Sequence, residues 1–283
     1  MKAGNALLAL HLGALLFGLS GIFGKLANTT PLAVVAGRGL FAVIALALFA
    51  QLFRTAQSAR PTARQVWQLG FGGLLLGGHW LAFFEAVNVA GVAIATLGFA
   101  SFPAFTVLLE GLLFRERTRI SEFAMVAVVT LGLVLVTPAF DLASQATLGL
   151  LWAVLSGLLF ALLSLLNRAT TREIDPVRAA LCQNLVVMTC LLPVAWPTLA
   201  ELDAWAWGWL ALLGVLCTGL AHSLFVASLR VIKARNAAVI FALEPVYGIA
   251  FAWWLFSEEP TLRMLLGGAL IILAIIGSAR LAR

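Results

Sequence analysis

The sequence predicts an all-α membrane protein that crosses the bilayer many times. Of the 283 residues, 63% are hydrophobic and only 11% are charged, whereas soluble domains carry about 25% charged residues. Apolar runs near the ~20 residues that a helix needs to cross the hydrocarbon core recur along the whole chain. These runs lack the period-2 alternation of barrel strands. The mean hydropathy of +1.06 agrees with this fold class.

We predict ten membrane helices from these apolar runs. The first run continues to about Lys25 with no cleavage-site pattern after it, so we interpret it as a membrane helix and not as a signal peptide. The expected helices are 4–25, 32–53, 68–88, 91–114, 120–138, 147–168, 177–196, 208–229, 236–256 and 263–281.

The distribution of basic residues predicts which side of the membrane each loop occupies. If the N-terminus is cytoplasmic, 15 of the 18 basic residues fall on inner segments, and cytoplasmic loops characteristically carry this excess. Lys25 and Arg263 are the two that fall outside, and Arg38 lies within the second helix. The inner ones are Lys2, Arg54, Arg60, Arg64, Arg115, Arg117, Arg119, Arg168, Arg172, Arg178, Arg230, Lys233, Arg235, Arg280 and Arg283. We therefore expect both termini in the cytoplasm. The net charge of +6 is explained by these loops, so we expect no nucleic-acid partner.

An internal repeat relates the two halves of the chain. The stretches FPAFTVLLEGLLFRE (102–116) and EPVYGIAFAWWLFSE (244–258) align at a shift of 142 residues. The matched positions include Pro103 with Pro245, Phe105 with Tyr247, Phe114 with Phe256 and Glu116 with Glu258. Trp67, Gly72 and Gly77 match Trp209, Gly214 and Gly219 at the same shift, and Lys25 matches Arg168 at 143. We predict two five-helix repeats, 1–140 and 141–283. Because five is odd, the second repeat enters the membrane from the opposite side, as in many secondary transporters.

These features resemble the drug/metabolite transporter superfamily in its EamA-type branch. The resemblance rests on a proline in the fourth and ninth helices followed by a glutamate thirteen residues later, here Pro103…Glu116 and Pro245…Glu258. Within that branch, HLGALLFGLSGIFGKLA, GGHWLAFFEAVNVAGVAIATLGFASFPAFTVLLEGLLFRE and FALEPVYGIAFAWWLFSEE are most similar to the YddG-type amino acid exporters of bacteria. This resemblance implies export of aromatic and other neutral amino acids, such as threonine or methionine, across the cytoplasmic (inner) membrane.

Two histidines are candidate substrate-binding residues because an ionisable group within the bilayer is expensive and usually functional. His79 lies near the middle of the third helix, and Phe83 shares its helical face. His222 in the eighth helix is its near-counterpart in the second repeat. The alternative for both is a hydrogen bond to a neighbouring helix that serves packing alone.

Two further binding candidates lie next to the repeated prolines. Glu244 directly precedes Pro245, which frees a backbone carbonyl about one turn earlier, and its carboxylate could bind a substrate ammonium or a proton. Ser101 lies in the small-residue stretch GFASF just before Pro103 and is a candidate for a pocket floor.

Arg38 and Glu85 are candidates for a gate or mouth of the pathway. Arg38 could snorkel to the end of the second helix or pair with Glu85, and Glu85 could itself be a snorkelling carboxylate near the outer end of the third helix.

The expected function is export of amino acids by alternating access through a central cavity, as a facilitative uniporter. No Walker motif is present. The first helix has no Asp or Glu, whereas the small multidrug exporters related to the superfamily that this chain resembles use a glutamate there to exchange protons for drug. The alternative is a proton-coupled exporter of another small metabolite or drug. A more distant alternative is a rhomboid-like intramembrane serine protease, since GLSG (18–21) resembles the GxSG of those enzymes. We expect no enzymatic activity, no cofactor, no metal and no obligate protein partner, only an amino acid substrate and the lipid bilayer.

Overall fold

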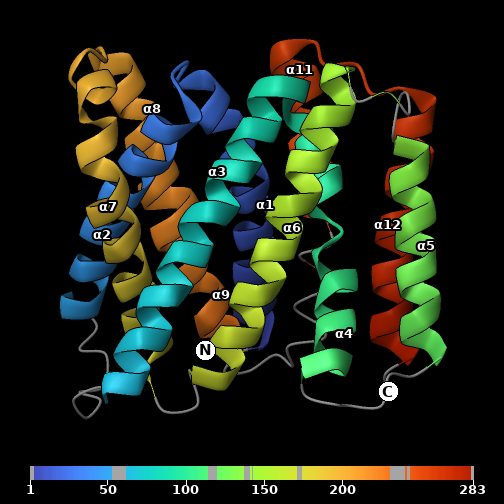
Figure 1. Ribbon diagram of the computed structural model, residues 1–283, viewed down its shortest axis with the longest axis horizontal. Coiled ribbons are helices and arrows are strands. Elements are labelled where there is room, and N and C mark those ends of the chain that lie inside the picture. The colour runs from blue at the N-terminus through green and yellow to red at the C-terminus, as the bar shows by residue number, and fades with distance from the viewer. Residues whose placement is uncertain are drawn as a thin grey trace.

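The computed structural model describes residues 3–52, 62–113, 120–136, 141, 143–170, 174–229, 240 and 243–281, and every regular element in these ranges is a helix. Among them, six helices are long and apolar enough to cross a membrane, and three shorter helices are apolar as well. The prediction of an all-α, many-helix membrane protein is therefore confirmed. Figure 1 shows the helices standing side by side in one bundle.

The first half of the chain forms five helices. They are α1 (Ala3–Leu26), α2 (Pro31–Leu52), α3 (Ala63–Phe99), α4 (Phe102–Leu113) and α5 (Ile120–Val136). The α3 helix contains the expected span 68–88 and the start of the expected span 91–114, and the non-helical backbone of Gly91, with φ 83° and ψ 170°, separates the two. The expected span 91–114 is itself broken at Ala100–Ser101, directly before Pro103.

The second half contributes the remaining helices. They are α6 (Gln145–Thr170), α7 (Pro176–Ala200), α8 (Ala204–Gly214), the π-helix η1 (Val215–Leu220), α9 (Ala221–Leu229), α11 (Glu244–Phe256) and α12 (Leu262–Leu281). The expected span 208–229 corresponds to α8, η1 and α9 in succession. The expected span 236–256 lies partly outside the described residues. Glu116 and many of the basic residues that predict orientation lie entirely outside them. These are Lys2, Arg54, Arg60, Arg115, Arg117, Arg119, Arg172, Arg230, Lys233, Arg235 and Arg283.

Polar caps explain where several helices begin. Thr62 and Gln65 form a reciprocal capping box at the start of α3, which satisfies backbone donors that the helix itself cannot pair. The Asp203 carboxylate accepts from the Ala206 N–H at 2.8 Å and caps α8. Asp175 caps α7 in the same way, directly before Pro176.

Helices of the two halves are interleaved in the bundle. The α2 helix packs against α7 and α5 packs against α12, while α1 contacts α8, α9 and α11. In the same way, α6 contacts α3 and α4. The start of α1 and the end of α12 lie at the same end of the bundle (Figure 1). Each helix of one half thus packs against the other half, which is the arrangement expected when a site is shared between repeats.

Candidate substrate-binding site

His79 is fixed between α3 and α6. Its side chain is buried, and Nδ1 lies 2.7 Å from Ser156 Oγ and 3.2 Å from the Ser156 carbonyl oxygen. The imidazole ring also lies 5.1 Å from the Phe99 ring and 5.0 Å from the Phe160 ring, between centroids. The described polar partner of His79 is therefore on α6.

An aromatic cluster surrounds this histidine, and we define it as His79, Phe83, Phe99, Phe102 and Phe160. Phe99 is stacked on Phe102 at 5.3 Å, and Phe102 meets Phe160 edge-on at 5.2 Å. Phe83 joins the cluster through an edge contact with Phe99 at 6.0 Å. The cluster thus connects both parts of α3 with α4 and α6, and the predicted residues His79 and Phe83 belong to it together.

Ser101 lies in the turn that separates α3 from α4. It is 1% exposed, and its hydroxyl has no hydrogen-bond partner among the described residues. The α6 helix approaches it closely at Gly157, where a Cβ would lie 2.8 Å from Ser101 Oγ. A buried hydroxyl without a partner is uncommon, so Ser101 offers a polar contact at the edge of the aromatic cluster.

Arg38 is buried in the middle of α2, only 3% exposed. Its Nε donates to Thr218 Oγ1 at 2.8 Å, and its guanidinium carbon lies 4.0 Å from the Trp80 ring centroid. Thr218 belongs to the π-helix η1, a local irregularity that is frequent at functional sites. The structure gives Arg38 partners on η1 and α3 that neither alternative from the sequence named, since those were snorkelling and pairing with Glu85.

Arg38 connects the other predicted site residues electrostatically. The Arg38 guanidinium and the Glu244 carboxyl carry opposite charges and lie within electrostatic range of each other, and His79 lies within range of the same guanidinium. Glu244 is half-buried at the first position of α11, next to Gly18 of α1, where a Cβ would lie 2.9 Å from the Glu244 carbonyl oxygen. We call Arg38, Thr218 and Glu244 the charged cluster. It adjoins the aromatic cluster through His79 and its neighbour Trp80.

The two remaining candidates, His222 and Glu85, lie outside the two clusters defined above. His222 is half-buried in α9, four residues after Thr218, and Glu85 is half-buried in α3, directly after Phe84. No described contact joins Glu85 to the charged cluster. Within the described part of the chain, no three His, Cys, Asp or Glu side chains come together as a metal site.

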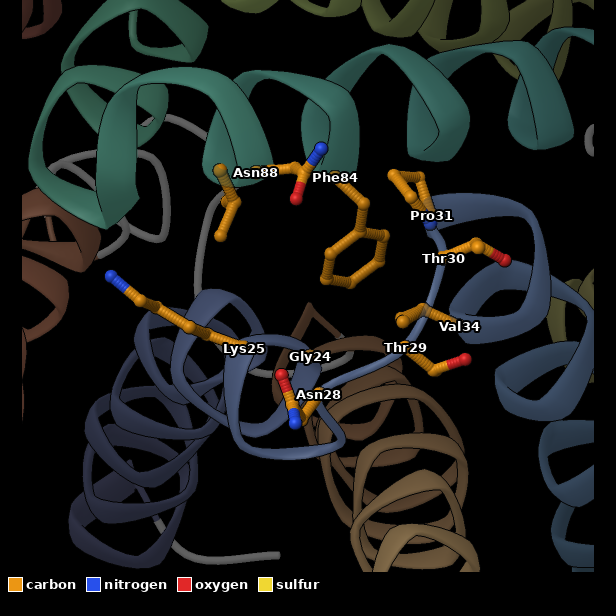
Figure 2. Close-up of a pocket in the computed structure, with 10 residues that line it drawn as sticks. Gly24, Lys25, Asn28, Thr29, Thr30, Pro31, Val34, Phe84 and Asn88 are labelled. Atoms are coloured by element: carbon orange, nitrogen blue, oxygen red, sulfur yellow. The ribbon is translucent and has the colours of Figure 1, made fainter. Parts of the chain in front are cut away.

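A vestibule opens at the end of the bundle opposite the N-terminus. It has a volume of about 490 Å³ and lies between the end of α1, the start of α2 and α3 (Figure 2). Its lining residues are Gly24, Lys25, Asn28, Thr29, Thr30, Pro31, Val34, Phe84, Val87 and Asn88. The Phe84 ring, whose centroid lies 5.9 Å from the Arg38 guanidinium carbon, connects the vestibule to the charged cluster.

A polar junction lies beside this vestibule, and we call it the Glu258 junction. The Glu258 carboxylate pairs with the Lys25 ammonium at the end of α1. Its Oε2 also accepts from the Val92 N–H at 2.9 Å and the Ala93 N–H at 3.4 Å, directly after the kink at Gly91. One carboxylate therefore holds α1, α3 and the segment after α11 together.

Sequence reasoning missed several residues that complete these clusters. Ser156, Phe160, Trp80 and Thr218 were not candidates for the site, because single hydroxyl and aromatic residues are common throughout apolar helices. The Glu258 junction did carry a signal: Glu258 ends the repeated proline–glutamate spacing, and Lys25 is a single cation at the end of an apolar helix.

Comparison with known proteins gives one family and several relatives. The model of the EamA-like transporter family matches the chain twice, over residues 4–137 and 147–280. An uncharacterized transporter, YxxF, of Bacillus subtilis is 24% identical over 94% of this chain and 87% of its own length. An uncharacterized transporter of Archaeoglobus fulgidus is 24% identical over 98% of this chain and 96% of its own length.

A solved crystal structure has the same fold. It superposes with a TM-score of 0.70 at 21% identity and covers 100% of this chain and 99% of its own. This similarity supports the arrangement of the helices and says nothing about the substrate.

Proposed function

The chain belongs to the EamA-like transporter family and is a membrane transporter, and from this premise we propose that it exports neutral amino acids, aromatic ones among them. The proposed location is the bacterial inner membrane, with both termini in the cytoplasm. We assign residues 1–140 and 141–283 to the two five-helix repeats whose exchange of conformation would expose the site to each side in turn.

The observation that carries this proposal is the pair of opposite charges within the membrane part of the fold. Arg38 on α2 and Glu244 on α11 carry opposite charges within electrostatic range of each other and come from the two different family matches. A free amino acid carries one carboxylate and one ammonium group. The guanidinium fork matches a carboxylate, and the Glu244 carboxylate suits an ammonium, so the two residues can bind the two ends of a zwitterion.

The aromatic cluster supplies a surface for the side chain of such a substrate. Aromatic rings attract one another in offset or edge arrangements, and Phe83 and His79 already make such contacts within the cluster. We propose that the substrate side chain packs against His79 and Phe83, with the Ser101 hydroxyl and His222 as further polar contacts. We also propose that Arg38 acts as a gate of this pathway when it takes the substrate carboxylate, and that Glu85 lies at its outer mouth.

We propose facilitated diffusion of the substrate down its own gradient. The first helix offers no carboxylate for proton exchange, and ATP-binding motifs are absent from the sequence. A second candidate is proton-coupled export of another small metabolite or drug, and it is favoured by one observation: Glu244 is an ionisable carboxyl in the bundle that could carry the proton.

Counterflow in proteoliposomes tests the substrate class. Purified protein is reconstituted in vesicles loaded with unlabelled phenylalanine, tryptophan, threonine, methionine, a nucleotide sugar or a drug cation, and uptake of the labelled compound is followed against protein-free vesicles. We expect the neutral amino acids to exchange. Exchange of the nucleotide sugar or the cation with none of the amino acids would refute the proposal.

The same vesicles decide between the two coupling modes. An outward-acid pH gradient imposed on substrate-loaded vesicles is expected to leave uniport flux unchanged. Strong acceleration of efflux by the gradient would instead establish proton coupling.

A further inference from the structure

Lys25 belongs to two features at once. Its ammonium pairs with Glu258 in the Glu258 junction, and its side chain lines the vestibule. Figure 2 shows Lys25 at the rim of the open space, with Asn28 on the same side and Asn88 and Phe84 across it. A ligand that enters the vestibule therefore meets the ammonium group that holds α1 to the segment after α11.

The Lys25–Glu258 ion pair can separate at low cost. The Lys25 side chain is 37% exposed whereas that of Glu258 is 19% exposed, and ion pairs with this much contact with water are weak. The Glu258 carboxylate keeps its bonds from the Val92 and Ala93 N–H groups when the lysine leaves. Separation of the pair therefore costs little free energy, because water or a ligand carboxylate can take the place of Glu258 beside the Lys25 ammonium.

The vestibule has the chemistry of an amphipathic binding site. Amide and hydroxyl groups of Asn28, Thr29, Thr30 and Asn88 line it together with Lys25, and Phe84, Val34 and Val87 provide apolar wall. Its volume of about 490 Å³ lies in the range of small-molecule sites. Its one lining cation, and the absence of a lining Asp or Glu from this set, favour a ligand that carries a carboxylate.

We propose that the vestibule is a second binding site for the transported amino acid, and that the substrate carboxylate binds Lys25 in competition with Glu258. This inference rests on the proposed function, because it assigns the outer end of the same pathway. Occupation of the vestibule then separates Lys25 from Glu258 and loosens α1 from the segment between α11 and α12. Substrate on the outer side thereby favours opening between the two repeats.

Two substitutions in the Glu258 junction test this competition. If the substrate carboxylate competes with Glu258 for Lys25, they change the half-saturation concentration in opposite directions. Lys25→Met removes the ligand for the carboxylate, so the half-saturation concentration for phenylalanine on the vestibule side should rise about tenfold, as for loss of a charge-assisted hydrogen bond. Glu258→Gln still accepts from the Val92 and Ala93 N–H groups but releases Lys25, so the half-saturation concentration should fall about threefold by removal of the competitor.

The measurement is counterflow in vesicles of established protein orientation, with phenylalanine and phenylalaninamide as paired substrates. The amide keeps the ring and the ammonium group but lacks the carboxylate, so Lys25→Met should leave its half-saturation concentration unchanged. Arg263→Met is the matched control, because it removes a positive charge at the start of α12 that does not line the vestibule. Lys25→Arg, which keeps the charge, should retain most of the affinity.

The outcomes separate this inference from the proposed function. If wild-type protein exchanges amino acids but Lys25→Met and Glu258→Gln shift the half-saturation concentration in the same direction, or not at all, Lys25 is only a structural contact and the inference is wrong. If the wild type exchanges no amino acid, the proposed function itself fails, whatever the variants do.

Discussion

At the scale of single residues, Arg38 decides how the site is organised. A lone charge within the bilayer is expensive, and Arg38 reduces this cost through a hydrogen bond to Thr218, a cation–π contact with Trp80 and its attraction to Glu244. Its three kinds of partner lie on three different helices. Such a residue stabilises the fold, and in the proposed function it also supplies the positive charge that binds the substrate carboxylate.

Replacement of Arg38 tests both roles. Arg38→Met removes the Thr218 hydrogen bond and the Trp80 contact and leaves the Glu244 carboxyl without a nearby positive charge, so we expect loss of transport together with a loss of stability on the order of 2 kcal/mol. The double variant Arg38→Met/Glu244→Gln should recover the part of that stability that is lost by isolating the Glu244 carboxyl, and should still fail to transport. Thermal denaturation in detergent and counterflow give the two values; a double variant as unstable as the single one would contradict the coupling between these residues.

At the scale of elements, the kink in α3 places the start of its second part against the Glu258 junction. Gly91 has φ 83° and ψ 170°, a region of backbone space that is nearly restricted to glycine. A Cβ at this position would also lie 2.8 Å from Glu258 Oε2. The chain can therefore reverse here, and present the Val92 and Ala93 N–H groups to the carboxylate, only because residue 91 lacks a side chain.

We expect Gly91→Ala to destabilise the protein by about 2 kcal/mol, from backbone strain and the clash with Glu258. Gly70→Ala is the matched control in the same helix, where an added Cβ meets nothing within 4 Å. That control should be neutral or stabilising by about 0.5–1 kcal/mol. Melting temperatures of the purified variants provide the comparison, and an equal effect at both positions would show that the special backbone of Gly91 is unimportant.

At the scale of the whole molecule, the helices of the two halves of the chain are interleaved. The family model matches both halves, and helices of one half pack against the other throughout the described bundle. His79 with Ser156 and Arg38 with Thr218 are both contacts between the halves. Movement of one half against the other must therefore change the site directly.

Reporter fusions test the inverted arrangement of these halves. Alkaline phosphatase joined after Ser144, between α5 and α6, should be active because five helices bring the chain to the outer side. Joined at the C-terminal end of the chain it should be inactive, whereas a fluorescent protein placed there should fold and fluoresce. Activity of the phosphatase at both positions, or at neither, would mean that the second half of the chain crosses the membrane an even number of times.

Much of this architecture follows from sequence because its causes are local. A bilayer requires about 20 apolar residues for each helix, and caps such as Thr62 with Gln65 lie within one turn. A repeat at a constant shift is visible without any structure. The grouping of His79 with Phe83 was also predictable, since residues four apart share a helical face.

The sequence by itself therefore determined the class of fold, the approximate helices, the repeat and the inventory of ionisable groups within the membrane. Only the tertiary structure decided their partners: Ser156 for His79, Thr218 and Trp80 for Arg38, and Lys25 with the α3 backbone for Glu258. With the exception of Arg38 and Trp80, these contacts join residues that are separated by 77 to 233 positions in the chain. Helical periodicity gives the direction of a side chain on its own helix, but its partner depends on how helices distant in the chain cross and at what height.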